Sequence, residues 1–355
     1  SSSVQRMSAE GSGITMVGNT FKWLYRSLVP SLFVVTCVMS GVQPAFSHDA
    51  AATPAASNPE VFKTAPAGTP TDRPGRNLQF LCILPLTALN NGVPPVYTES
   101  TNSWVHGLDI VVSEIPYVEG NVRWRNHRFK EIRRLYTRRF VGNNLPNHVT
   151  GEFPVKEGTA AYPYYKAAPG SPPYETADQI PIGPYKLDIT VPRSPSYNVV
   201  PTCIDQLVSG VATQTGVVWH VNIAPTSATT YADPIAALPP DECFGHPYSD
   251  PGTPEGQYHY HGWSWKCFPN QGNPKRHSPL FGYALDGFGI YGPRGEGGKV
   301  VTNDGLDECH GHFGVVNWEG RKRNMYHYHL NYEFPYGPGC LRGRPLINVN
   351  NEVPK

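Results

Sequence analysis

The residues best suited to chemistry in this chain are histidines, and they are concentrated in two copies of one short motif. The tetrapeptide Tyr-His-Tyr-His occupies residues 258–261 and again residues 326–329. Each copy follows the pattern Asp-Glu-Cys-x-Gly-His, at residues 241–246 and 307–312, and each precedes a further cysteine. This four-part repetition predicts an internal duplication, with motif units at residues 241–267 and 307–340.

Strand geometry indicates what the tetrapeptides could do. Side chains on a β-strand alternate between faces, and same-face neighbours lie roughly 6.5–7 Å apart. His259 and His261 therefore share one face, as do His327 and His329, while the tyrosines pack on the other. A same-face pair of imidazoles can grip one metal ion. Imidazole suits copper and zinc, whereas calcium prefers oxygen ligands, so the motif predicts copper or zinc and makes calcium less favoured.

Other histidines extend the candidate set. His246 and His312 hold equivalent positions in the repeat, so each is a candidate third ligand. His310 has Phe244 as its counterpart, which indicates that the two halves are not chemically equal. The single histidines are interpreted as hydrogen-bonding residues: His148, His220 and His277. A structural alternative also stays open for the tetrapeptides, in which the imidazoles bond to backbone groups.

The acidic residues carry weaker signals. Asp286 lies between Leu285 and Gly287 and could be a ligand, a partner that orients an imidazole, a general base or a turn residue. Asp304, Asp307 and Glu308 could hold calcium. Alternatively, the Asp-Glu-Cys phrases could tie loops together through backbone N–H groups.

The amino-terminal region has the features of an export signal. Lys22 and Arg26 precede an apolar run over residues 28–42, which is too short to span a membrane. Small residues in Ala45-Phe46-Ser47 suit cleavage after Ser47. We interpret residues 1–47 as signal peptide with an upstream lead-in and expect an exported protein, secreted, periplasmic or at the cell surface. A lipid-modified Cys37 is a weaker alternative, because Thr36 before it fits poorly. Residues 48–76 form an Ala/Pro-rich linker.

The cysteine pattern predicts disulfide bonds. Of the seven cysteines, all but Cys37 remain after signal removal, and an even number in an exported protein favours disulfides. The duplication pairs Cys243 with Cys267 and Cys309 with Cys340, and leaves Cys82 for Cys203. A cysteine metal site is disfavoured, because no Cys-x-x-Cys spacing occurs.

Composition and patterning predict the fold class. Glycine (35 residues) and proline (37 residues) interrupt the chain often, and 20 tyrosines suit half-exposed strands. We expect strands at residues 78–84, 105–112, 122–129, 185–191 and 217–223, and one short helix over residues 204–211. Long amphipathic helices do not alternate with these strands. The chain therefore predicts a mostly β protein, with a single β-sandwich-like domain over residues 77–350 and long disulfide-stapled loops.

The charge balance does not favour nucleic acid or an anionic membrane surface as a partner. Only 16% of residues are charged, and the net charge is +1. A run of arginines over residues 123–139, interleaved with aromatic residues, could bind a polyanion, but a solvated strand face explains it more simply. The chain also has no nucleophile elbow, P-loop or dinucleotide fingerprint.

Further phrases connect the chain to a known family. They include Leu145-Pro146-Asn147-His148, the segment 278–292 around Asp286, and Phe334-Pro335-Tyr336. With the tetrapeptides, they make residues 105–349 resemble the YHYH-domain family. The resemblance implies an exported or surface-associated domain and does not specify a reaction.

Three function classes follow from these observations. The leading one is an exported histidine-rich protein that binds copper or zinc at the duplicated strands, with catalysis left open. The second is a non-catalytic, disulfide-stapled surface domain that binds a glycan or a protein partner. The third is a metal-assisted hydrolase with Asp286 as its base.

Overall fold

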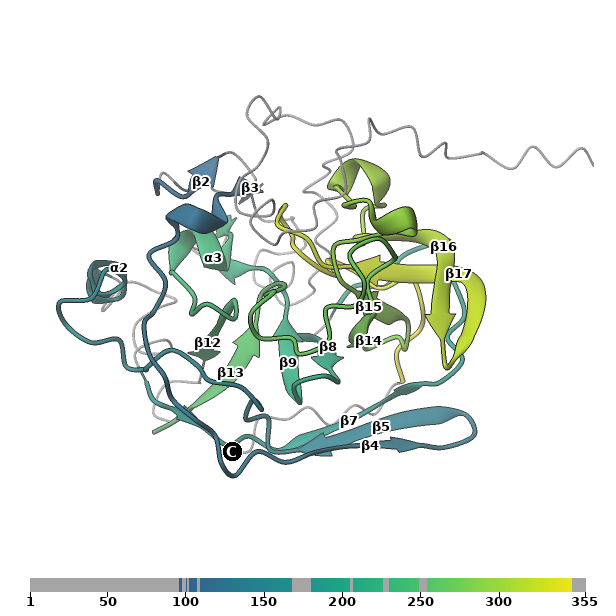
Figure 1. The fold of residues 1–355 in the computed structure, drawn as a ribbon, viewed down its shortest axis with the longest axis horizontal. Coiled ribbons are helices and arrows are strands. Elements are labelled where there is room, and N and C mark those ends of the chain that lie inside the picture. The colour runs from purple at the N-terminus through teal and green to yellow at the C-terminus, as the bar shows by residue number, and fades with distance from the viewer. Residues whose placement is uncertain are drawn as a thin grey trace, which may run out of the picture. The chain divides into compact units, whose positions relative to one another are not determined.

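The described part of the molecule is mostly β (Figure 1). A computed structural model describes residues 96–346 of the chain, except residues 98–99, 101, 107–108, 168–179, 205–206, 226–229 and 249–253. All of these belong to one compact unit, His48–Lys355. The predicted signal peptide, linker, strand 78–84 and Cys82 lie outside the described residues.

A nine-stranded mixed sheet forms the centre of the structure. Its strands run in the order β12, β13, β9, β8, β14, β15, β17 and β16, and β6 adds to β13. The bounds are β6 (Ile182–Gly183), β8 (Val208–Ala212), β9 (Val217–His220), β12 (Gly245–Tyr248), β13 (Gly256–Tyr260), β14 (Leu280–Ala284), β15 (Gly289–Tyr291), β16 (Gly311–Trp318) and β17 (Arg321–His329).

The strand order of this sheet reads the same way from its centre toward either edge. β8 and β14 pair antiparallel in the middle, and each has an antiparallel hairpin partner, β9 or β15. Next comes a parallel strand that carries a tetrapeptide, β13 or β17, and then an antiparallel edge strand, β12 or β16. Both inner hairpins also contain a register shift near the start of β8 or β14. The two tetrapeptides therefore occupy matching positions on opposite sides of the sheet.

Smaller sheets and short helices complete the described part. β4 (Phe129–Arg133), β5 (Thr137–Gly142) and β7 (Leu187–Pro192) form an antiparallel sheet, which packs on the central one where Phe140 stacks with Tyr283 at 5.8 Å. The remaining elements are β1 (Val96–Tyr97), β2 (Val105–His106), β3 (Asp109–Ile110), β10 (Ala224–Pro225), β11 (Thr230–Ala232), α2 (Tyr162–Ala167), α3 (Pro234–Ala237) and the 3-10 turns η3 (Val112–Glu114), η4 (Glu296–Gly298) and η5 (Asn303–Gly305).

Two local predictions are wrong. The predicted helix over residues 204–211 overlaps strand β8 at residues 208–211, and every residue of β8 is buried. A central strand buried on both faces is apolar throughout, so its apolar positions also satisfy a helical spacing. The predicted strand 122–129 is irregular apart from an isolated bridge between Val122 and Thr150, and β4 begins only at Phe129. The expected strand 105–112 is divided into β2, β3 and η3, whereas 185–191 and 217–223 correspond to β7 and β9 with shifted ends.

Disulfide bonds close a loop around each tetrapeptide strand. Cys243 bonds to Cys267 and Cys309 bonds to Cys340, the two pairs that the repeated spacing predicts. Cys203 is also disulfide-bonded. Its predicted partner, Cys82, lies outside the described residues.

Candidate metal centres

The first half of the sheet brings three histidines together, and we call this cluster centre A. His246 on β12 pairs across the hairpin with His259 on β13, and His261 follows β13 directly. The Nε2 atom of His261 lies 2.9 Å from that of His246 and 3.0 Å from that of His259. All three side chains are buried.

The second half brings His277, His327 and His329 within reach of one another, with His312 beside His329, and we call this cluster centre B. His312 on β16 pairs with His327 on β17, and His329 ends the same strand. The Nε2 atom of His329 lies 3.0 Å from that of His327 and 3.2 Å from that of His312. His277, from the segment before β14, adds an Nε2 atom at 3.2 Å from that of His327.

Hydrogen bonds fix the tautomer of two centre A rings, His259 and His261. The Nδ1 of His259 lies 3.1 Å from the carbonyl oxygen of Gln257, which can only accept, so this nitrogen donates. The Nδ1 of His261 lies 2.8 Å from the Oδ1 of Asn222, whose amide nitrogen donates to the Pro335 carbonyl. Both rings therefore carry their proton on Nδ1, and their Nε2 lone pairs face each other.

Backbone carbonyls fix the tautomer of three centre B rings in the same way. The Nδ1 atoms of His277, His327 and His329 donate to the carbonyl oxygens of Ser278, Met325 and Gly292 at 2.8, 3.1 and 2.7 Å. A neutral imidazole has one donor nitrogen and one acceptor nitrogen. Three Nε2 lone pairs therefore converge within this centre.

Converging lone pairs repel unless a cation lies between them. A proton is a poor candidate, because burial holds the pKa values of His259, His261, His327 and His329 well below the usual value of 6.5 and lowers that of His246 to about 3. A metal ion fits better. Nitrogen ligands at about 2.0–2.1 Å in a tetrahedral site lie about 3.3 Å from one another, close to the separations found in both centres.

The two centres are separate. Strands β9, β8, β14 and β15 lie between β13 and β17, which places the two tetrapeptide strands about 24 Å apart along the sheet at ordinary strand spacing. The four tetrapeptide histidines therefore do not meet in a single cluster. Each half of the sheet contains its own histidine cluster.

Comparison with known proteins identifies the domain. Residues 188–303 match the family model described as "YHYH protein". The chain carries a YHYH domain. The matched stretch contains every centre A histidine and His277, and it ends before the second tetrapeptide. No curated protein and no solved structure matches the chain.

Two histidines of the YHYH domain have roles that sequence reasoning missed. His277, interpreted from the sequence as a lone hydrogen-bonding residue, joins centre B. His220, at the end of β9, stacks on His259 with ring centroids 3.7 Å apart and lies 3.1 Å from the Gln257 side-chain oxygen through its Nε2. Neither residue belongs to a repeated phrase. Only the pairing of β9 with β13 and the path of the segment before β14 bring them to the centres.

Two other histidines, His310 and His148, lie outside both centres. His310 bonds through Nδ1 to the His329 carbonyl at 2.7 Å and through Nε2 to the Asn303 side chain at 2.9 Å. His148 bonds to the Tyr260 hydroxyl at 2.5 Å and approaches Cys243, but the Cys243 and Cys267 sulfurs are joined to each other and cannot act as thiolate ligands.

The aspartates of the two Asp-Glu-Cys phrases organise loops. Asp241 accepts hydrogen bonds from the Tyr258 hydroxyl and from the backbone N–H groups of Cys243 and Gly245. Asp307 repeats this network with the equivalent residues Tyr326, Cys309 and Gly311. Arg342 also pairs with Asp307 at 2.9 Å and with Glu308 at 2.5 Å, so these carboxylates face a guanidinium group.

Asp286 contacts a tyrosine of the YHYH motif, not a histidine. Its buried carboxylate accepts from the Tyr328 hydroxyl at 2.6 Å, from the Gly343 N–H at 2.8 Å and from the Phe288 N–H at 3.1 Å. Burial raises its pKa to about 6. Tyr328 lies on the face of β17 opposite His327 and His329. Asp286 therefore holds β17 through the face that lies opposite the histidines.

The arginine run at residues 123–139 is largely neutralised where it enters strands. Arg133 and Arg138 pair with Glu131, and Arg139 pairs with Asp188 at 2.6 Å.

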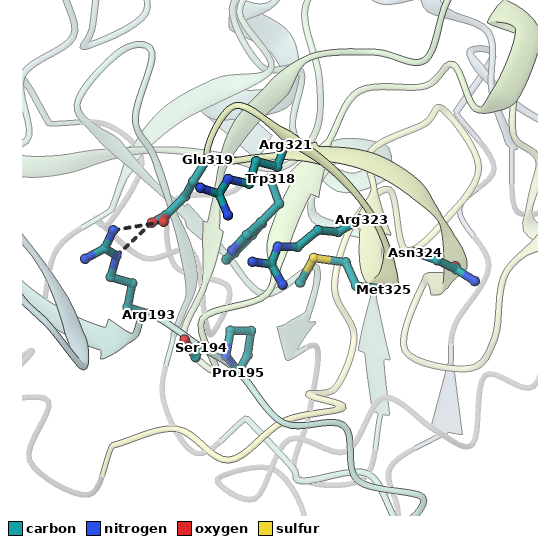
Figure 2. Close-up of a pocket in the computed structure, with 9 residues that line it drawn as sticks. All are labelled: Arg193, Ser194, Pro195, Trp318, Glu319, Arg321, Arg323, Asn324 and Met325. Atoms are coloured by element: carbon teal, nitrogen blue, oxygen red, sulfur yellow. Dashed lines mark hydrogen bonds and ion pairs between the residues drawn. The ribbon is translucent and has the colours of Figure 1, made fainter.

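A separate pocket of about 660 Å³ lies at the β16–β17 turn and is lined by Arg193, Ser194, Pro195, Trp318, Glu319, Arg321, Arg323, Asn324 and Met325 (Figure 2). None of these residues belongs to centre A or centre B.

The surroundings of the domain agree with its expected location. Its disulfides are compatible with an exported protein. Within the described residues, no helix has the length and apolar character needed to cross a membrane.

Proposed function

We propose that this protein is an exported metal-binding protein that holds one transition-metal ion, copper or zinc, in each of its two histidine centres. The observation that carries the proposal is the tautomer pattern. Rings whose Nδ1–H groups are committed to oxygen acceptors direct their Nε2 lone pairs at one another over 3.0–3.2 Å. An ion that accepts nitrogen lone pairs removes this repulsion.

The donor set selects the class of metal. Imidazole nitrogen is a borderline ligand that suits copper and zinc, and it does not suit calcium or magnesium, which prefer oxygen. Among divalent ions, copper binds such sites more tightly than zinc. Availability in the exported compartment therefore decides which ion occupies the protein.

The residues around the rings favour metal binding by orienting the rings and keeping them neutral. Acceptors on Nδ1 orient each ring and increase the basicity of its Nε2. Burial lowers the pKa values of the rings, which keeps them neutral and available as ligands at neutral pH. A bound copper ion would supply redox chemistry and a bound zinc ion Lewis acidity.

The symmetric strand order supports a duplication origin for the two centres. Equivalent tyrosines and histidines lie at equivalent register positions in both halves. Equivalent aspartates and cysteines form matching hydrogen bonds and disulfides. We propose that one metal-binding unit was copied, and that the two copies join through the β8–β14 pair.

A second candidate function rests on the pocket at the β16–β17 turn. Arg193 and Arg138 hold Glu319 and lower its pKa to about 2, which leaves the carboxylate fully neutralised by its partners. Arg321 and Arg323 form no ion pair within the described residues. A surface domain could use these guanidinium groups to bind an anionic glycan. The double change Arg321→Ala with Arg323→Ala would then weaken binding to a carboxylated or sulfated glycan and leave metal content unchanged.

Elemental analysis tests the metal proposal. Protein purified without added metal, or reconstituted with zinc, should contain about two equivalents at pH 7. The double change His259→Ala with His261→Ala should remove one equivalent, and His327→Ala with His329→Ala should remove the other. His127→Ala is the control, because His127 bonds to the Leu145 carbonyl outside both centres. If both double variants keep full stoichiometry, the tetrapeptides are structural strands and the glycan-binding candidate leads.

A further inference from the structure

Each centre directs three imidazole nitrogens at one ion, whereas a tetrahedral metal site needs four ligands. From this shortfall we infer that the ion in each centre takes a small anion from solution as its fourth ligand. The inference rests on the proposed metal binding and deepens it. A position left open to an exogenous ligand is what separates catalytic zinc sites from closed structural ones.

The two ligand sets are of the same size. The nitrogens that lie within 4.8 Å of one another belong to His246, His259 and His261 in centre A, and to His277, His327 and His329 in centre B. The rings are inclined to one another by 59–84° in centre A and by 48–59° in centre B, so their in-plane lone pairs can reach one ion. Among the described residues, no carboxylate joins either set.

His220 lies beside centre A, and its orientation prevents it from supplying a fourth nitrogen. A metal–imidazole bond lies in the plane of the ring, along the nitrogen lone pair, at about 2.0–2.1 Å. The His220 ring is stacked on the His259 ring at 3.7 Å, with only 12° between their planes. An ion in the plane of His259 therefore stays well outside the plane of His220.

His312 lies beside centre B and does not complete it. Its Nε2 lies 3.2 Å from that of His329, whereas His277 approaches the Nε2 of His327 at 3.2 Å. The nitrogens of a tetrahedral site lie about 3.3 Å from one another. His312 is not part of the set that meets even the wider limit of 4.8 Å. An ion held by that set therefore keeps one position without a protein ligand.

Charge indicates which kind of ligand fills the open position. Neutral imidazoles leave both positive charges of a divalent ion uncompensated. The ionisable neighbours that act on His261 are His246 and His220, and those that act on His327 are also histidines. A buried charge is costly unless an opposite charge pairs with it. An anion at the fourth position supplies that opposite charge.

Burial limits the size of this anion. The centre A side chains are at most 6% exposed, and those of His327 and His329 are at most 1% exposed. His277 is half-buried, so centre B lies closer to solvent. An ion of a few atoms, such as a halide or a short carboxylate, is therefore the class of ligand that suits both centres.

Azide binding to the cobalt-loaded protein tests the inference. Cobalt(II) replaces zinc in such sites and reports coordination by visible absorption. The protein is loaded, its bound cobalt is measured, and azide, an anion of three atoms, is then titrated. We expect one azide for each bound cobalt ion, and therefore two azides per chain.

Variants assign each azide to its centre. The double change His259→Ala with His261→Ala should remove one cobalt together with one azide. His327→Ala with His329→Ala should remove the other cobalt and the other azide. His220→Phe keeps a ring stacked on His259, so we expect two cobalt ions and two azides in that variant.

The inference is overturned if the native protein binds fewer than one azide for each cobalt, because a protein ligand then closes at least one centre. It is also overturned if His220→Phe loses one cobalt. A protein that binds no cobalt refutes the proposed function itself, and the cobalt measurement that precedes the azide titration distinguishes that case.

Discussion

Centre A and centre B are each built on a hairpin of the same design, and they differ in the residues that surround the hairpin. Both pair a Gly-His strand with a Tyr-His-Tyr-His strand in the same register, and both tie the preceding loop to an aspartate and a disulfide. The differences come from residues outside the repeated phrases. His277 reaches centre B from a neighbouring segment, and His220 covers centre A without pointing at it. A repeated motif therefore provides the frame of each histidine cluster, while unrepeated residues set which other side chains surround it.

Removing a disulfide should have the largest effect on stability, and it tests whether the two halves are built alike. Each bond closes a loop around one tetrapeptide strand, so the double change Cys243→Ser with Cys267→Ser should lower the free energy of unfolding by about 2–5 kcal/mol. Chemical denaturation measures the loss. If the halves are built alike, Cys309→Ser with Cys340→Ser should cost a similar amount, and each variant should lose metal mainly from its own centre. Equal metal loss from both centres would contradict the view that the halves hold their ions independently.

Replacing Asp241 and replacing Asp307 should destabilise the protein to different extents. Asp241 is 1% exposed, whereas the Asp307 side chain is 24% exposed and shares its charge with Arg342. Asp241→Ala leaves the Tyr258 hydroxyl and several N–H groups without their acceptor in the interior, at about 1–3 kcal/mol for each buried unsatisfied group. We expect Asp307→Ala to destabilise less in thermal unfolding, since water can reach that loop. The opposite ranking would show that the Arg342 ion pair outweighs burial.

Asn222 distinguishes the centres through metal affinity. It is the only side chain among the described Nδ1 acceptors of centre A, whereas the described acceptors of His277, His327 and His329 are all carbonyls of the backbone. Removing such a partner typically costs 10–100-fold in affinity. Asn222→Ala should therefore weaken one of the two bound ions in a chelator competition, and centre B should keep its native affinity. A control is Asn147→Ala, because Asn147 donates to the Gln214 carbonyl on the surface.

The smallest effect we expect concerns the pH dependence of the metal-free protein. Burial lowers the pKa values of His148 and His220 to about 4, below the unfolded value of 6.5. The unfolded chain therefore takes up protons first, and stability is lost as the pH falls from about 6.5 toward 4.

Buried carboxyl groups offset part of this loss. The pKa values of Asp241 and Asp286 are raised to about 6 by burial, so these groups bind protons in the fold before they do in the unfolded chain, and they add stability as the pH falls through 6. The melting temperature should therefore decline below pH 6.5, and less steeply below pH 6. His220→Phe should flatten the first part of the decline. A melting temperature that rises between pH 7 and pH 6 would contradict this balance.

The sequence by itself determined the features that depend on short separations along the chain. The alternation of side chains fixed which tetrapeptide residues share a face, and the repeated spacing indicated Cys243 with Cys267 and Cys309 with Cys340. His246 and His312 were identified as candidate ligands for the same reason, because each stands at a fixed place before its tetrapeptide.

The tertiary structure decided everything that depends on strand order. Only the sheet separates the two tetrapeptides by four strands, brings His277 to His327, and lays His220 flat on His259. It also made residues 208–212 a buried strand, although their apolar spacing suits a helix. The physical reason is that local spacing limits the relative positions of residues only a few places apart. A histidine cluster of this kind is formed by segments that are distant in the sequence. Which segments meet is set by pairing and burial across the whole domain.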